Sequence, residues 1–232
     1  MTQHFLPGEP DIPLILRHSA RARRISLRVS QLDGRVTLTL PKRVALDTAL
    51  DFAREKEPWI RKHLASRATD VQIELGVCMP VEGRMLQLSE GTGRKVTITG
   101  TQLHVPGPSE RVAKRLEGYL KALARERLAA ASDLYASRLG RTYSALTLRD
   151  TRSRWGSCTT QGRLMYSWRL VLAPPDVLSY VAAHEVAHLA HMDHSPAFWR
   201  TVVDIFGEYD RQRAWLRGEG NALHRYRFVA PS

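Results

Sequence analysis

Hydrophobic and polar positions alternate over short stretches of the first hundred residues, which is the pattern of half-buried strands. Glycine-containing turns separate these stretches, and Asp33-Gly34 is a hairpin signal between two of them. The expected strands are 14–17, 24–30, 35–40, 71–74, 85–88, 95–99 and 103–105. A helical pair is expected between Asp47 and Arg67, with Pro58 opening its second member.

The hydrophobic period becomes helical after Pro106-Gly107-Pro108-Ser109, which is the best candidate for a domain boundary. One long helix is expected from there to about Leu139, where Gly140 ends it. Further strands are expected at 145–149, 152–158 and 164–171, and further helices after Pro174, at 196–206 and near 211–217. The pattern predicts an α+β protein in two parts: a β-rich N-terminal region with a helical pair (residues 1–106) and a helix-and-sheet core (residues 107–232).

The chain carries 35 Lys and Arg against 23 Asp and Glu, a formal net charge of +12. Such an excess favours anionic partners, such as nucleic acid, phosphate-bearing ligands or acidic proteins. The densest group of arginines comprises Arg17, Arg21, Arg23, Arg24 and Arg28. Alternation with apolar residues places Arg24, Ser26 and Arg28 on the outward face of an expected strand.

Two cysteines, Cys78 and Cys158, are too few for a disulfide scaffold and fit a reducing compartment. The apolar run from Ile12 to Leu16 is too short for a secretory leader and is broken by Pro13. No apolar segment approaches the roughly 20 residues of a membrane span. We therefore expect a soluble cytoplasmic protein.

His184-Glu185-Val186-Ala187-His188 has the H-E-x-x-H spacing of zinc hydrolases. The helical period around it places this segment on a helix, where positions i and i+4 share a face, so that His184 and His188 can bind one metal ion. Glu185 can reach a metal-bound water, whose pKa zinc lowers to about 7, without being a ligand itself. The spacing predicts a site for one zinc ion, although nickel, cobalt or manganese also bind histidine-rich sites.

A catalytic zinc site takes three protein ligands and leaves one position for water. His194, six residues after His188, is the favoured third ligand, because Ser195-Pro196 starts a new helix and makes the chain turn first. His191 would share the face of His188 if the motif helix continued. Glu208, from a downstream helix, is the other alternative.

Three runs flank the motif: Arg154-Trp155-Gly156-Ser157-Cys158, Trp168-Arg169-Leu170-Val171-Leu172-Ala173-Pro174, and His194-Ser195-Pro196-Ala197-Phe198-Trp199. Together with the motif they resemble the YgjP-like metal-dependent hydrolases, predicted metallopeptidases related to the SprT and WLM proteins. The resemblance is specific over about 149–216 and weaker over 24–40 and 57–60. Val186 and Ser167 depart from the family's common Leu and Asn, and neither is at a ligand position.

The resemblance implies a zincin-like α+β core with His184, His188 and His194 as zinc ligands and Glu185 as catalytic base. It also implies a strand above the cleft, beside the motif helix. The run 154–158 would then be an edge along which an extended substrate pairs, or else a tight turn with a buried tryptophan.

The leading hypothesis is a zinc-dependent metallopeptidase in which Glu185 activates the attacking water. Peptides or proteins are the expected substrates, by analogy of motif and fold. The developing oxyanion needs a further donor. The sequence offers four candidates without selecting among them: Arg154, Tyr166, His191 and His224.

Two other functions fit the basic composition. A metal site combined with arginines could hydrolyse a nucleotide phosphoanhydride, although no P-loop pattern is present. Alternatively, basic strands could bind a nucleic-acid backbone while the site cleaves bound proteins. The sequence gives neither the physiological substrate nor the oligomeric state.

Overall fold

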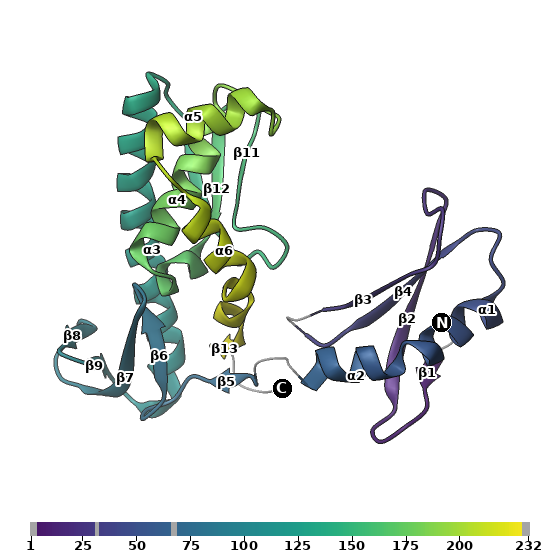
Figure 1. The fold of residues 1–232 in the computed structure, drawn as a ribbon. Coiled ribbons are helices and arrows are strands. Elements are labelled where there is room, and N and C mark those ends of the chain that lie inside the picture. Colours follow the sequence, from purple (N-terminus) through teal and green to yellow (C-terminus); the bar gives the residue numbers. More distant parts are fainter. Residues whose placement is uncertain (1–3, 31–32, 66–68, 229–232) are drawn as a thin grey trace. The chain divides into compact units, whose positions relative to one another are not determined.

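A computed structural model of the 232-residue chain describes residues 4–30, 33–65 and 69–228. The chain forms two compact units, Met1–Thr69 and Asp70–Ser232 (Figure 1). The sequence places the boundary near Pro106 instead. The difference arises because the strands just before that point share one hydrophobic core with the long helix that follows it. A turn rich in Pro and Gly therefore lies inside the second unit.

The first unit is a four-stranded sheet with two helices. Its elements are β1 (His4–Leu6), β2 (Ile12–Ser19), β3 (Ser26–Val29), β4 (Val36–Pro41), α1 (Leu46–Glu55) and α2 (Glu57–Ala65). The strand order is β1-β2-β4-β3, with β2 and β4 parallel. The Asp33-Gly34 hairpin is confirmed, because β3 and β4 pair antiparallel and Gly34 has φ +70°. Ser26 and Arg28 face outward, as the alternation predicts.

The second unit begins with two small sheets and the long helix. Its first elements are β5 (Val71–Gln72), β6 (Cys78–Val81), β7 (Arg84–Gly91), β8 (Thr97–Thr99), β9 (Gln102–Pro106) and α3 (Ser109–Leu139). The strand order is β6-β7-β9-β8, and β5 pairs with β13 (Tyr226–Arg227) near the C-terminus. Gly140 ends α3 in the left-handed conformation, as expected.

The remaining elements build the part of the molecule that carries the motif. They are β10 (Ala145–Arg149), β11 (Gly156–Cys158), β12 (Arg163–Ser167), the 3₁₀ helix η1 (Trp168–Leu172), α4 (Pro175–Ala187), α5 (Pro196–Phe206), α6 (Asp210–Gly218) and the 3₁₀ helix η2 (Gly220–Arg225). The sheet order is β10-β12-β11, so β11 is an edge strand. The expected strand to Val171 ends at Ser167 and continues as η1, whose five residues are all buried. Buried apolar runs do not distinguish strand from helix by period, which explains this error.

Helix α4 lies at the centre of the second unit, against α3, α5, α6 and β11 (Figure 1). Nine of its 13 residues are buried, and they point in every direction around its axis. Only apolar side chains, or polar ones with hydrogen-bond partners, are tolerated in such a position, because burying an unpaired polar group costs free energy. The polar side chains that α4 does carry therefore call for an explanation. The α+β class expected from the sequence is confirmed.

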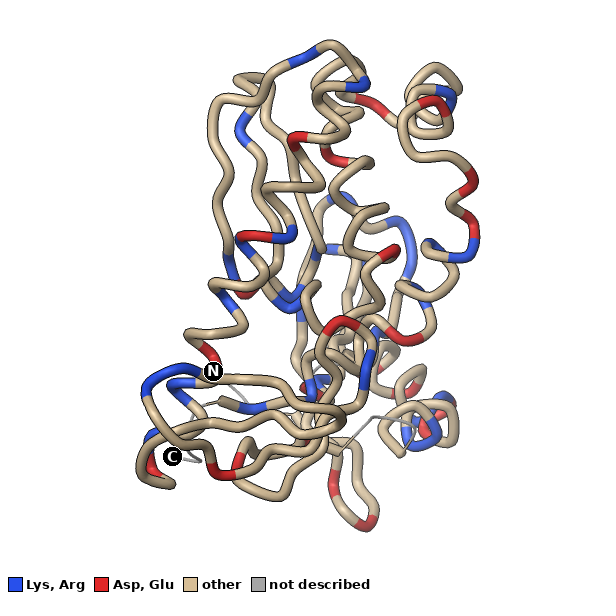
Figure 2. Tube along the Cα trace, turned by 90° about the vertical axis from the view of Figure 1, so that its left-hand side faces the viewer, with Lys and Arg blue, Asp and Glu red and all other residues tan. Residues whose placement is uncertain are grey.

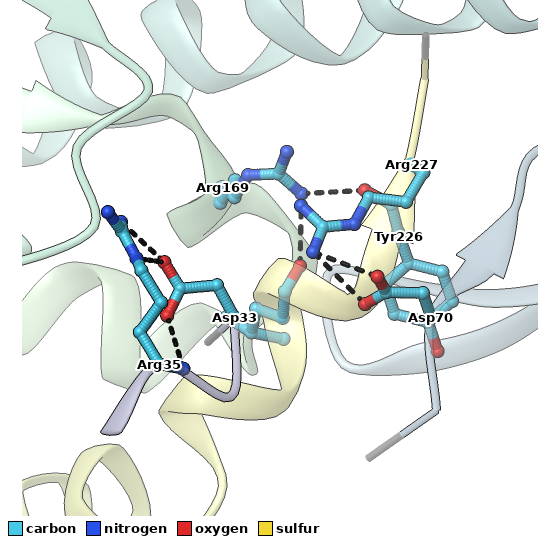
Figure 3. Close-up of polar contacts among 7 residues, drawn as sticks. Asp33, Arg35, Asp70, Arg169, Tyr226 and Arg227 are labelled. Carbon is cyan, nitrogen blue, oxygen red and sulfur yellow. Dashed lines mark hydrogen bonds and ion pairs between the residues drawn. The ribbon is translucent and has the colours of Figure 1, made fainter. Parts of the chain in front are cut away.

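The C-terminal segment is anchored by Arg169 of η1, which is 6% exposed. Its guanidinium donates to both carboxylate oxygens of Asp150, at 2.7 and 3.0 Å. It also donates to the carbonyl of Leu223 and to that of Tyr226, which Figure 3 shows. Burial by itself would raise the pKa of Asp150, but the hydrogen bonds and charge of Arg169 outweigh it and lower that pKa. A second pair, Arg227 with Asp70, holds the β5–β13 edge.

Replacing Arg169 with Ala is expected to lower the free energy of unfolding by about 3 kcal/mol, because two carbonyls and a partly exposed carboxylate lose their donor. Arg169→Lys should recover only part of this, since an ammonium cannot form the bidentate pair. Urea unfolding followed by circular dichroism measures both. Arg149→Ala, at an exposed position at the end of β10, is the control and should change stability by less than about 0.5 kcal/mol. An equally small effect at Arg169 would refute the anchoring role.

Candidate metal centre

Two histidines lie one turn apart at the end of α4. His184 and His188 are separated by four residues and therefore share a face, with ring centroids 5.1 Å apart. The helix ends at His188, which is its C-cap residue. Both side chains thus project from the last turn of a buried helix, as the motif predicts.

The chain then turns and brings back a third histidine. Ser195 caps α5 by accepting a hydrogen bond from the backbone N–H of Phe198, and Pro196 occupies the first turn. Nε2 of His194 lies 3.1 Å from Nε2 of His184. One ring nitrogen from each of the three histidines falls within 4.8 Å of the other two.

The other two candidates for the third ligand lie elsewhere. His191 contributes its backbone carbonyl, which lies 2.9 Å from Nδ1 of His188. This contact fixes the imidazole ring of His188 and leaves Nε2 of that ring facing the cluster. Glu208 is exposed on the segment after α5, and it is not part of any metal-binding group found among the described residues.

Aromatic side chains hold the imidazole rings in place. Phe198 of α5 lies against all three histidines, with ring centroids 4.5–4.9 Å away. Trp199 approaches His184 and His194 at 5.6 and 5.7 Å. Nδ1 of His184 is buried without a hydrogen-bond partner among the described residues, so packing rather than hydrogen bonding orients this ring. The Phe198-Trp199 run is therefore a scaffold for the cluster.

The electrostatics of the cluster favour neutral imidazoles. Burial, together with the neighbouring His188 and His194, lowers the pKa of His184 to about 3. Burial also lowers the pKa of His188, against the opposing hydrogen bond to the carbonyl of His191. Neutral imidazole is the form that ligates metal ions.

The residues present fit a tetrahedral metal ion. Two nitrogens bound at about 2.0–2.1 Å to such an ion lie roughly 3.3 Å apart, close to the 3.1 Å between His184 and His194. Two imidazole nitrogens at this distance have only one hydrogen between them to share, whereas an ion satisfies both lone pairs. Three imidazoles and no thiolate form a set that suits zinc.

Glu185 lies next to the cluster and is 6% exposed. Burial raises the pKa of its carboxyl to about 8, while the positive charge of Arg154 opposes this shift. Among the described residues, no group donates a hydrogen bond to this carboxylate or forms an ion pair with it. A buried, unpaired carboxylate on a central helix costs free energy and is typical of a functional group.

Gly156 of β11 leaves the space that this carboxylate occupies. A Cβ atom built on Gly156 would lie 2.5 Å from Cγ and 2.6 Å from Oε1 of Glu185. Because real Cβ atoms do not approach other atoms so closely, a side chain at position 156 would displace Glu185. The edge strand and the carboxylate are therefore in direct contact.

If Glu185 is the base that the sequence predicts, Gly156→Ala should lower turnover by about 10- to 100-fold with the fold and metal content retained, because small displacements of a catalytic group have effects of that size. Peptide hydrolysis measures the loss. Gly118→Ala on α3, where a Cβ meets nothing within 4 Å, is the matched control and should leave turnover unchanged. Full activity of the Gly156 variant would show that this contact is unimportant.

Only one of the four sequence candidates for the oxyanion donor lines the cleft. Arg154 does so and acts electrostatically on Glu185. Tyr166 is fully buried, and its hydroxyl lies 3.0 Å from the hydroxyl of Ser132. His224 is buried against Trp155, with ring centroids 5.3 Å apart, and His191 contributes its backbone. Within the run 154–158, Gly156–Cys158 form the edge strand β11, and the half-buried Trp155 comes directly before it.

Sequence reasoning missed the residues that close the cleft from α6. Arg213 and Arg217 line a cavity beside His184 and Glu185. A second cavity, of about 250 Å³, is lined by the three histidines of the cluster together with Glu185 and β11. No local motif marks the two arginines, because they lie 29 and 33 residues beyond His184 and reach the site only through the packing of α6 on α4.

Three clustered imidazoles beside a buried carboxylate are the arrangement of a metal-dependent hydrolase. The family model "YgjP-like, metallopeptidase domain" matches residues 23–219. The chain belongs to this family, as its motifs suggested, and it is a metal-dependent hydrolase of the metallopeptidase class.

Other comparisons add little. The crystal structure of the metallopeptidase zymogen of Pyrococcus abyssi abylysin is similar over 40% of this chain and 95% of that one, with 18% identity and a TM-score of 0.36. No curated protein matches the chain. Within the described ranges, no helix combines the length and apolar character needed to cross a membrane.

Proposed function

We propose that this protein is a zinc-dependent metallopeptidase in which His184, His188 and His194 hold the metal ion and Glu185 is the general base. The observation that supports it best is the convergence of three imidazoles within 4.8 Å at the end of a helix that also carries a buried carboxylate. When bound, the ion would polarise the scissile carbonyl and lower the pKa of a water molecule. Peptide or protein is the substrate class that the family favours.

Glu185 would take a proton from the attacking water and pass it to the leaving nitrogen as the C–N bond breaks. Its position beside His184 and against Gly156 places the carboxylate between the metal ligands and the edge strand. Arg154 is the favoured donor to the developing oxyanion, because it lines the same cleft and its charge reaches Glu185.

The edge strand would align the substrate. β11 pairs with β12 on one side only, so its other edge presents backbone donors and acceptors. An extended peptide can add to such an edge as a further strand, which brings one peptide bond past the histidines.

Metal analysis coupled to peptide cleavage tests the proposal. The purified protein is expected to carry about one zinc ion per chain and to cleave peptides or an unfolded protein. Chelation should reduce cleavage to background, and stoichiometric zinc should restore it and raise the unfolding temperature. The proposal would be wrong if the protein bound one ion and yet cleaved no member of a diverse peptide mixture.

A further inference from the structure

A cavity of about 380 Å³ opens beside Glu185 and His184, at the Gly156 end of the edge strand. Three of its lining side chains are arginines, one before β11 and two on α6: Arg154, Arg213 and Arg217. The volume is in the range of small-ligand pockets. The chemistry described so far uses the histidines, the carboxylate and Arg154, but it gives no role to the two arginines of α6.

The cavity is strongly cationic. Arg213 and Arg217 are four residues apart on α6 and therefore share the face that lines it. Within the described ranges, none of the three arginines forms an ion pair with a carboxylate, and Glu185 is the single acidic residue of the lining. Three guanidiniums that face one cavity repel one another, so an anionic occupant is favoured.

The walls between the arginines are apolar and fixed. Trp155 packs against Gly220, where a Cβ would lie 3.1 Å from the indole, and against His224. Tyr180 of α4 stacks on Tyr209, with ring centroids 5.6 Å apart. The Arg213 guanidinium lies 4.7 Å from the Trp199 ring centroid, so this arginine is positioned before any ligand arrives.

We infer that this cavity is a specificity pocket that binds a carboxylate of the substrate, next to the peptide bond to be cleaved. The inference rests on the proposed peptidase function and specifies its substrate class. Guanidinium groups bind carboxylates through paired, charge-assisted hydrogen bonds, and the apolar walls accommodate the methylenes that carry the carboxylate. The carboxylate has two possible sources: an acidic side chain or the C-terminus of the substrate chain.

Cleavage-site profiling tests the inference. The wild-type protein digests a mixture of peptides, half with free and half with amidated C-termini, and mass spectrometry identifies the cleaved bonds. Enrichment of Asp or Glu at one position indicates a side-chain carboxylate, and cleavage confined to free C-termini near the bond indicates the terminal carboxylate. Arg213→Gln and Arg217→Gln should reduce the enrichment, whereas Arg211→Gln, an exposed neighbour on α6 outside the cavity lining, should preserve it.

A binding experiment separates this inference from the proposed catalysis. Zinc-loaded Glu185→Gln protein is titrated with fluorescent peptides that differ only by Asp against Asn, or by a free against an amidated C-terminus. The carboxylate form is expected to bind about 10- to 100-fold more tightly, and the Arg213→Gln and Arg217→Gln changes should reduce this ratio to about twofold. Raising the salt concentration should also reduce it.

Equal affinity for the acid and amide peptides would overturn the inference, even if the wild-type protein is an active peptidase. Arginine-dependent binding of ATP without any acid-to-amide discrimination would also overturn it, since the pocket would then serve phosphate. Circular dichroism and metal content of each variant verify that the fold and the zinc site remain intact.

Discussion

Replacing Glu185 with Gln is expected to lower kcat by about 10²- to 10⁴-fold while the protein still binds one metal ion. Glutamine has nearly the same shape and can occupy the space above Gly156, but it cannot accept a proton from water. The three histidines are unchanged, so metal affinity should remain close to that of the wild-type protein. Stability should not decrease, because a neutral amide is easier to bury than a carboxylate.

Peptide hydrolysis, metal analysis and thermal unfolding measure these three properties. Glu208→Gln is the matched control, since it makes the same chemical change at an exposed position away from the cluster. We expect the control to behave as wild type in all three. A Glu185→Gln protein with normal turnover and one bound ion would remove Glu185 from the mechanism.

Replacing His194 with Ala is expected to weaken metal binding by more than about 100-fold and to reduce hydrolysis to background. Removing one of three imidazoles leaves only the two on α4, which cannot hold the ion in a fixed geometry. His191→Ala is the matched control, because its backbone carbonyl, the group that contacts His188, is still present. This control should bind metal almost as tightly as wild type.

Competition with a zinc-binding dye measures both affinities under the same conditions. The comparison also decides among the alternatives that the sequence left open. If His191→Ala or Glu208→Ala lost the metal and His194→Ala kept it, the ligand set assigned here would be wrong.

Much of the architecture could be predicted from the sequence, because many of its signals are local. α3 begins after the turn that ends at Pro108 and stops before Gly140, and α5 begins after its cap Ser195, as expected. Short alternating strands were placed within a few residues. The errors fall where burial overrides local pattern: the apolar run after Ser167 became a 3₁₀ helix, the short strand β13 depends on pairing with β5, far away in the chain, and the short strands β1 and β6 were missed although each pairs with the next strand.

The sequence by itself determined the pair of histidines with its adjacent carboxylate, because helical periodicity fixes the spacing of residues three and four apart. It also indicated the turn before Ser195 that makes His194 available. Only the tertiary structure decided that the ring of His194 meets that of His184, that Gly156 contacts Glu185, and that Arg213 and Arg217 line the adjoining cavity. The last two of these contacts join segments far apart in the chain, and all three depend on how helices and strands pack.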